Sequence, residues 1–166
     1  MSPILTPRLC LREFTLADAP FVLQLLNDPD FIRFIADKGV CSIADAEAYL
    51  QAGPLASYAA NGFGLWAVAH RQTGELLGMC GLIRRPDVPH VDVGYAFMPQ
   101  ARGQGYAVEA AAAARAYGLD VLALPQVVGF IDPANRASAK VLQAIGLQSQ
   151  GMVSLPGVDG DTELFA

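Results

Sequence analysis

The segment VGYAFMPQARGQGYA, residues 93–107, is the part of this sequence that says most about its fold. The apolar and β-branched residues at positions 91–97 predict a strand, and the alanine-rich run over 107–119 predicts a helix. Gly103 and Gly105 lie in the turn between the two. Such a turn points consecutive unpaired backbone N–H groups and the positive end of the helix dipole at one spot. The segment therefore predicts a diphosphate site that is built from main chain.

Two common phosphate-binding motifs do not fit this turn. A P-loop requires GxxxxGK followed by Ser or Thr, and the sequence contains none. A dinucleotide fingerprint, GxGxxG, follows the first strand of its domain, whereas here Val108 occupies the position of the third glycine and the turn lies late in the chain. An NAD- or nucleotide-binding enzyme is therefore disfavoured. The alternative to a ligand site is a tight turn in which the glycines only relieve strain.

The segments on either side alternate between strand and helix patterns. Upstream, a strand is expected over 7–14, and helices are expected from Thr15 and from Ser42, each of which suits a helix N-terminus. A strand over 62–69, a turn at 71–74 and a strand over 76–83 read as a hairpin. Downstream we expect a strand, a helix closed by Gly146, and two short strands, over 127–131, 134–145, 152–155 and 162–165. With no repeat or linker, the chain of 166 residues predicts one mixed α/β (α+β) domain over 1–166.

Composition narrows the class of protein. Hydrophobic residues make up 53% and charged residues 16%, which is typical of a packed domain and not of a disordered chain. The net charge of −5 disfavours a nucleic acid partner, so a polyanion must be bound by local main-chain chemistry. No apolar run reaches a membrane span, and the first residues do not resemble a signal peptide, so we expect a cytoplasmic protein without a membrane partner.

The cysteines do not indicate a metal centre. Cys10, Cys41 and Cys80 are odd in number and widely spaced, and no Cys/His cluster accompanies them. We therefore expect reduced thiols, no disulfide framework and no metal site.

Residues 102–107, RGQGYA, match the pattern Q/R-x-x-G-x-G/A and resemble the coenzyme A diphosphate loop of the GNAT acetyltransferases. The flanking segments VDVGYAF at 91–97, EA at 109–110, DPANRASAKVL at 132–142 and GL at 146–147 extend the likeness. So do TPRLCLR at 6–12 and DA at 18–19. Together they resemble the branch that contains the ribosomal-protein N-terminal acetyltransferases, over nearly the whole chain. The resemblance implies a mostly antiparallel, twisted central sheet, splayed between strands four and five and flanked by helices.

The resemblance also implies which residues contact the co-substrate, acetyl-CoA. The pantetheine arm would lie in the gap between the splayed strands, against the main chain of Ala96, Phe97 and Met98. Asn135 would contact the same arm. Alternatively, it has no role in binding and only lies in the first turn of a helix whose N-cap is Asp132. The diphosphate would be held by the loop residues Arg102, Gly103, Gln104, Gly105, Tyr106 and Ala107.

Asp92, Ser138 and Asn135 form the expected catalytic set. Asp92 stands where this branch often has a glutamate and is a candidate base for the amine, directly or through water; alternatively it faces solvent or binds a substrate cation. Ser138 would lie near the thioester sulfur as a hydrogen-bond or proton donor, or be an ordinary helix serine. Many members place a tyrosine acid where this chain has Leu142, so that acid is excluded. His90 is a weaker candidate base.

The resemblance implies an acetyl-CoA-dependent N-acetyltransferase whose acceptor amine attacks the thioester directly in a ternary complex. The acceptor is a protein N-terminal α-amine or a small-molecule amine, and ionisation favours an α-amine, since its pKa lies near 8. Asp37, Asp45 and Glu47 loosely suit a cationic acceptor. The alternative is a domain that binds or senses acyl-CoA without chemistry. Either a monomer or a homodimer is compatible with the sequence.

Overall fold

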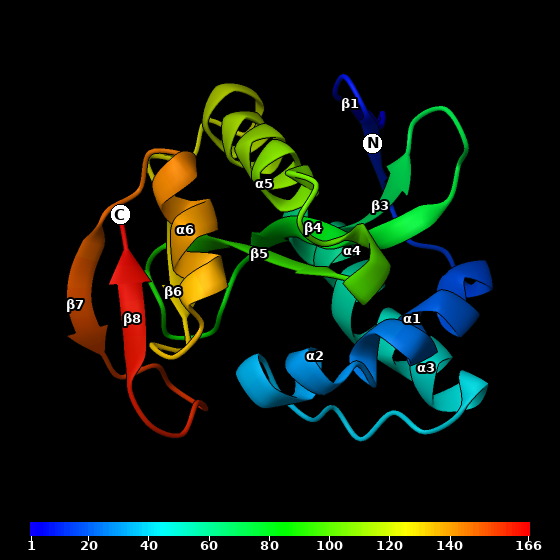
Figure 1. The fold of residues 1–166 in the computed structure, drawn as a ribbon, viewed down its shortest axis with the longest axis horizontal. Helices are drawn as coiled ribbons and strands as arrows, with labels where there is room; N and C mark the ends of the chain where they lie inside the picture. Colours follow the sequence, from blue (N-terminus) through cyan, green and yellow to red (C-terminus); the bar gives the residue numbers. More distant parts are fainter.

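A single twisted sheet of eight strands forms the centre of the computed structural model, which describes all 166 residues (Figure 1). The order across the sheet is β1-β2-β3-β4-β5-β6-β8-β7. Only the β5–β6 pair is parallel; every other neighbouring pair is antiparallel. The strands are β1 Ile4–Leu5, β2 Leu9–Arg12, β3 Leu65–His70, β4 Leu76–Ile83, β5 Val91–Phe97, β6 Val127–Ile131, β7 Ser149–Val153 and β8 Thr162–Phe165. The predicted mixed α/β class with a mostly antiparallel sheet is confirmed.

Helices cover both faces of this sheet. On one face, α5 and α6 pack on a core that includes Trp66 and Val68, while on the other the N-terminal helices pack on a second core that includes Ala67. Successive residues of β3 thus point to opposite faces, as a strand requires. The helices are α1 Ala19–Leu26, α2 Pro29–Phe34, α3 Ile43–Leu50, α4 Ala56–Asn61, α5 Tyr106–Ala116 and α6 Arg136–Ala144. None of them has the length and apolar character that a membrane span needs.

The sheet splits between β5 and β6, which are the fourth and fifth strands when the two-residue β1 is left out. The two strands pair only at Val91 with Val127 and at Asp92 with Val128. Beyond that point β6 pairs with β8 alone, through Gly129 and Phe165. Residues 93–97 of β5 therefore have a neighbouring strand on one edge only. The predicted splay is confirmed, and it opens a gap beside the glycine-rich turn.

Several element boundaries differ from the sequence expectations for local reasons. The helix expected from residue 134 begins at Arg136, because Asn135, and not Asp132, is its N-cap. The helix expected over 107–119 is α5, which ends at Ala116 and is followed by a turn of π-helix, Tyr117–Val121. The expected strand over 152–155 lies at Ser149–Val153, where an exposed edge strand without apolar alternation pairs with β8.

Candidate active site

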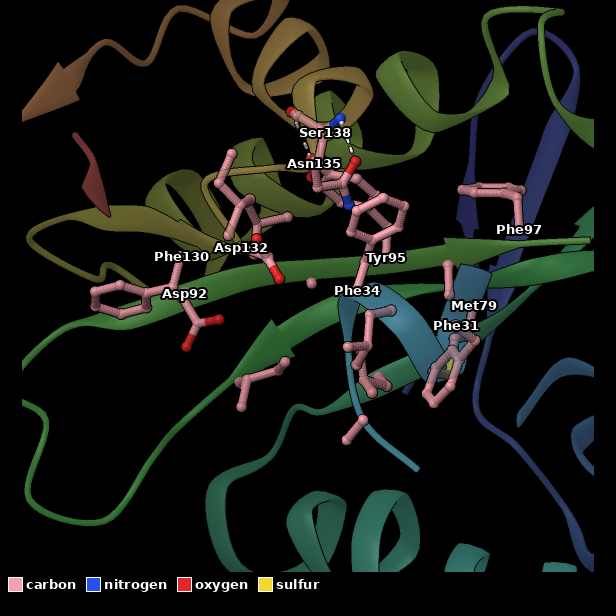
Figure 2. Close-up of a pocket in the computed structure, with 18 of the residues that line it drawn as sticks. Phe31, Phe34, Met79, Asp92, Tyr95, Phe97, Phe130, Asp132, Asn135 and Ser138 are labelled. Atoms are coloured by element: carbon pink, nitrogen blue, oxygen red, sulfur yellow. Dashed lines mark hydrogen bonds between the residues drawn. The ribbon is translucent and has the colours of Figure 1, made fainter. Parts of the chain in front are cut away.

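One connected cleft of about 1210 Å³ lies where β5 and β6 diverge (Figure 2). Its walls come from α2, from β4 and β5, from the glycine-rich turn with the start of α5, and from the end of β6 with the start of α6. The loop between β7 and β8 closes the remaining side with Leu155 and Val158. Segments far apart in the sequence thus meet at the gap in the sheet.

The main chain of the glycine-rich turn offers free donors to this cleft. The N–H groups of residues 103–108 donate to no acceptor in the protein, whereas Arg102 N–H donates to Pro99 O (3.2 Å) and Glu109 N–H to Gly105 O (3.1 Å). Gly103 and Gly105 adopt φ of 74° and 80°, which only glycine takes up without strain. Six consecutive amides are therefore left for an outside acceptor at the N-terminus of α5, which is an arrangement suited to a diphosphate.

The edge of β5 that faces the gap is defined by its hydrogen bonds with β4. Met98 N–H donates to Leu77 O (2.9 Å), and its carbonyl accepts from Ala101 N–H (2.9 Å). Ala96 pairs with Met79 in the same ladder. Because peptide groups alternate along a strand, Phe97 and Tyr95 point their N–H and C=O groups into the gap. Of the three residues predicted to meet the pantetheine arm, only Phe97 has its main chain turned that way; Ala96 and Met98 use theirs on β4 and on the following turn.

Asn135, Ser138 and Tyr95 meet at the opposite wall of the gap (Figure 2). The Asn135 side-chain oxygen caps α6 by accepting from Ser138 N–H (3.1 Å), which leaves its Nδ2 group without a protein partner. Tyr95 Oη lies 2.6 Å from Ser138 Oγ and donates to Ser138 O (3.0 Å). Burial raises the pKa of Tyr95, so its hydroxyl stays protonated at neutral pH. From the sequence, Tyr95 could either line the cleft or belong to the core, and only the fold shows its bond to Ser138.

Asp92 lies on the other face of β5, since it is three positions from Tyr95 on an extended strand. Its side chain is 1% exposed, and both oxygens accept from Arg85, at 2.8 Å from Nε and 3.1 Å from the terminal nitrogen. Burial raises the pKa of Asp92 more than the Arg85 guanidinium lowers it. Asp92 is thus neither solvent-facing nor free. The sequence did not identify Arg85, which lies just after β4 and is brought beside Asp92 by the Ile83–Asp92 register of the β4–β5 pair.

The remaining positions named from the sequence lie outside the cleft lining. Leu142 is fully buried in the core. His90 is not part of the cleft lining, and neither are Asp37, Asp45 and Glu47. The acidic groups that line the cleft are instead Asp28, Asp30, Asp92, Asp132, Asp159 and Asp161.

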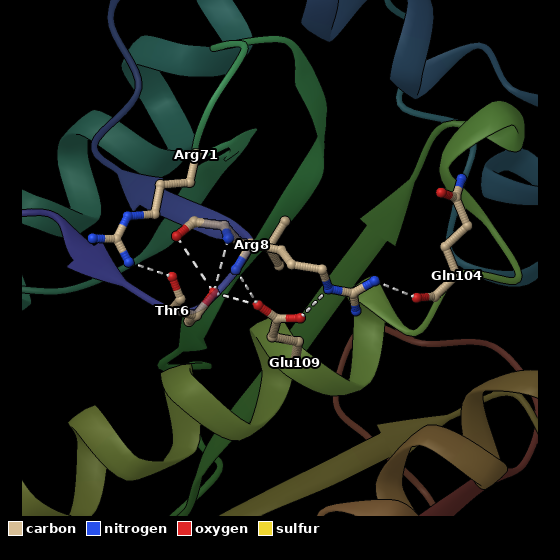
Figure 3. A network of polar contacts seen from close by, with 6 residues as sticks. Thr6, Arg8, Arg71, Gln104 and Glu109 are labelled. Carbon is tan, nitrogen blue, oxygen red and sulfur yellow. Dashed lines mark hydrogen bonds and ion pairs between the residues drawn. The ribbon is translucent and has the colours of Figure 1, made fainter.

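A partly exposed polar network holds the glycine-rich turn and the start of α5 against the N-terminal segment (Figure 3). Glu109 accepts from Thr6 Oγ1 (2.6 Å), from Arg8 N–H (2.9 Å) and from Arg8 Nε (2.7 Å). Arg8 also donates to Gln104 O (2.8 Å) and covers the Tyr106 ring at 4.5 Å. The Gln104 carbonyl and the Tyr106 ring take part in this support, while the N–H groups of both residues belong to the free set.

These features agree with the family comparison. The model of the acetyltransferase (GNAT) domain matches residues 8–148. The chain belongs to the GNAT acetyltransferase family. Its members are N-acetyltransferases, and that is the enzyme class of this chain. The RGQGYA turn that predicted this family is the turn that carries the free amides.

Curated relatives match at moderate identity. YkkB of Bacillus subtilis is 36% identical over 88 residues, which cover 52% of this chain and 51% of that protein, so this match spans about half the length of the relative. The N-acetyltransferase YoaA of Bacillus subtilis is 27% identical over 92% of this chain and 87% of its own length.

Solved structures share the fold over almost the whole chain. An acetyltransferase from Agrobacterium tumefaciens is 26% identical, with a TM-score of 0.83 and coverage of 99% of this chain and 93% of its own. RimL, a ribosomal L7/L12 alpha-N-protein acetyltransferase in complex with coenzyme A, also has a TM-score of 0.83, covering 99% and 96%, at 17% identity. At that identity the likeness to RimL shows the fold alone.

Proposed function

We propose that this N-acetyltransferase moves the acetyl group of acetyl-CoA to a primary amine by direct attack within a ternary complex. The observation that carries the proposal is the row of six unpartnered amides, residues 103–108, at the open end of the gap between β5 and β6. A thioester carrier with a diphosphate at one end and a narrow amide-bearing arm fits both features at once.

The contacts of the co-substrate follow from which groups are free. The amides of residues 103–108 hold the diphosphate, and the Phe97 N–H and the main chain of Tyr95 pair with the pantetheine arm as a strand would, since the Phe97 carbonyl already accepts from Arg102. The unpartnered Nδ2 of Asn135 donates to the same arm from the opposite wall. The N–H of Arg102 does not belong to the diphosphate site, because it is bonded to Pro99 O; Arg102 lies at the start of the loop.

The base and the proton donor of the proposed reaction lie on opposite faces of β5. Asp92 on one face accepts a proton from the amine, directly or through water, as the nitrogen attacks the thioester carbonyl. On the other face the Ser138 hydroxyl, held by Tyr95 Oη, donates to the departing sulfur. A thiolate whose conjugate thiol has a pKa of about 8.5 needs little help to leave, so the absence of a tyrosine at Leu142 is tolerable.

The acceptor we propose is a protein N-terminal α-amine or a small-molecule amine. An α-amine with a pKa near 8 is about one-tenth neutral at pH 7, whereas a lysine amine with a pKa near 10.4 is almost wholly charged. A carboxylate held by Arg85 is a modest base and suits the more acidic amine.

One observation favours a second function, a domain that binds or senses acyl-CoA without turnover. Both oxygens of the candidate base Asp92 are already bonded to Arg85. Incubation with acetyl-CoA and a panel of amines and N-terminal peptides, with detection of free thiol, separates the two functions. Thiol release that depends on an amine supports transfer, and tight CoA binding without any release supports the sensor.

The diphosphate site is tested by Gly105→Glu, with Gly105→Ala as its matched control. Both replace a residue at φ of 80°, at a backbone cost of about 1–2 kcal/mol. Only the glutamate adds a negative charge beside the free amides. We expect Gly105→Glu to weaken CoA binding at least a hundredfold by calorimetry, about 3 kcal/mol, while Gly105→Ala loses much less. Equal losses in the two variants would show that backbone geometry, and not a phosphate contact, governs binding.

A further inference from the structure

The Arg102 guanidinium joins the glycine-rich turn to the helix on the far wall of the cleft. Its terminal nitrogens donate to Asp28 (2.5 Å) and Asp30 (2.9 Å), and its Nε donates to Phe97 O (3.2 Å). Every nitrogen of the guanidinium thus has a protein acceptor. The three acceptors come from the start of α2 and from the edge of β5 that faces the gap.

The Asp28 carboxylate depends on this partner. Its side chain is 5% exposed, and it caps α2 by accepting from Phe31 N–H (3.1 Å). If Arg102 turned toward a bound phosphate, it would leave a buried carboxylate without its counter-charge, which is strongly unfavourable. The guanidinium is therefore better placed to hold α2 than to bind the diphosphate.

Helix α2 forms part of the cleft wall. Phe31 packs in the second core, and Phe34 lines the cleft beside it (Figure 2). Asp28 and Asp30 make the only polar contacts between α2 and any residue beyond Val40, and both end on Arg102. The position of Phe34 thus depends on the residue that precedes the six free amides.

We infer that Arg102 is a positioning residue that couples occupation of the amide cradle to the placement of α2, and so prepares the acceptor wall once the co-substrate is bound. This inference rests on the proposed function for its kinetic consequence, but not for the coupling itself. A diphosphate that fixes residues 103–108 also fixes Arg102, its immediate neighbour, and through the two aspartates it restrains α2. Coupling of this kind is typically worth a 5- to 150-fold change in affinity at the second site.

The test uses Arg102→Gln, Asp28→Asn, their double variant and the milder Asp30→Asn, whose site is more than half exposed. Asp28→Asn retains an oxygen that caps α2. Arg12→Gln is the matched control, since it removes a two-bond pair with the buried Asp18 outside the cleft. Each protein is measured for CoA affinity, for amide hydrogen exchange of residues 29–36 with and without CoA, and for acceptor KM and kcat.

In the wild type and in Arg12→Gln, we expect CoA to slow exchange in residues 29–36. In Arg102→Gln and Asp28→Asn this protection should disappear, the acceptor KM should rise about tenfold, and CoA affinity should change less than threefold. Asp30→Asn should show the same pattern to a smaller extent. The double variant should be no worse than either single one, because both remove the same link.

Two results would overturn the inference. A loss of CoA affinity beyond tenfold in Arg102→Gln, with Asp28→Asn unaffected, would make Arg102 a phosphate ligand. Undiminished protection of α2 in Arg102→Gln would show that no coupling passes through it. If the wild type binds CoA but acetylates no amine, the proposed function fails, and the exchange data still decide the coupling.

Discussion

At the scale of single residues, Asp92 and Arg85 determine how activity should respond to pH. Burial raises the pKa of Asp92, and Arg85 opposes that rise by stabilising the carboxylate. If Asp92 accepts the proton, kcat/KM rises with pH as this carboxyl ionises. Arg85→Gln removes the opposing positive charge, so it should move the rising limb to higher pH. Asp92→Asn should remove that limb and lower the rate about a hundredfold, the lower end for general-base catalysis.

The measurement is kcat/KM for the acceptor across pH, with acetyl-CoA saturating. Asp132→Asn is the control, since it removes another carboxylate of the cleft that is exposed and bonded only to Ala134 N–H. An unchanged profile in Asp92→Asn would remove Asp92 from the mechanism. The candidate set Asp92, Ser138 and Asn135 came from sequence resemblance. Arg85 could not be identified from the sequence, because strand register brings it beside Asp92. The role of Tyr95 could not be identified either, because helix packing brings Ser138 to it.

At the scale of elements, Glu109 ties α5 to the strand at the other end of the chain. Burial raises the pKa of Glu109, but the hydrogen bonds from Thr6 and Arg8 outweigh it and hold the pKa below its usual value. A lowered carboxyl pKa stabilises the fold at pH above the ordinary value of 4.5 and loses that contribution as the pH falls through the folded value. Glu109→Gln should therefore cost about 1–3 kcal/mol of unfolding free energy at pH 7.

The measurement is urea unfolding of both proteins at pH 7 and at pH values below the ordinary carboxyl range. The difference between them should shrink at the lower pH, as the wild-type carboxyl takes up a proton. Glu75→Gln, on an exposed turn residue whose carboxylate has no protein partner, should change little at either pH. A penalty for Glu109→Gln that stays constant with pH would mean that packing, and not the charge, makes the contribution.

Elements with a clear apolar pattern were predictable, and those set by caps or edges were not. The strands over 76–83, 91–97 and 127–131 lie where the sequence placed them, because most of their residues are apolar and buried. The sequence indicated a break over residues 27–30 with a second helical region after it, whereas α2 begins within that break at Pro29, because Asp28 is its N-cap. The edge strand β7 was misplaced by three residues at its start, because exposed residues carry no periodic signal.

At the scale of the whole molecule, the gap in the sheet joins two parts by very few main-chain bonds. The strands β2 to β5 pair over long stretches, whereas β6 pairs with β5 at only two positions and β8 and β7 follow behind it. Side chains of α5 and α6 bridge the parts in a common core. Sequence alone predicted this splay only by resemblance, since a gap is a property of pairing between strands 30 residues apart, a separation that no local pattern encodes.

Occupation of this gap should stabilise the molecule unevenly. A ligand at one hundred times its Kd adds about 2.7 kcal/mol to the unfolding free energy, which for a domain of this size raises Tm by about 5–10 °C. Because the pantetheine arm replaces the missing strand pairing, CoA should slow amide exchange in β6 and along residues 93–97 more than in β3. ADP, which carries the diphosphate but no arm, should protect residues 103–108 and leave β6 unchanged. Uniform protection of the whole sheet by both ligands would show that the arm does not lie between these strands.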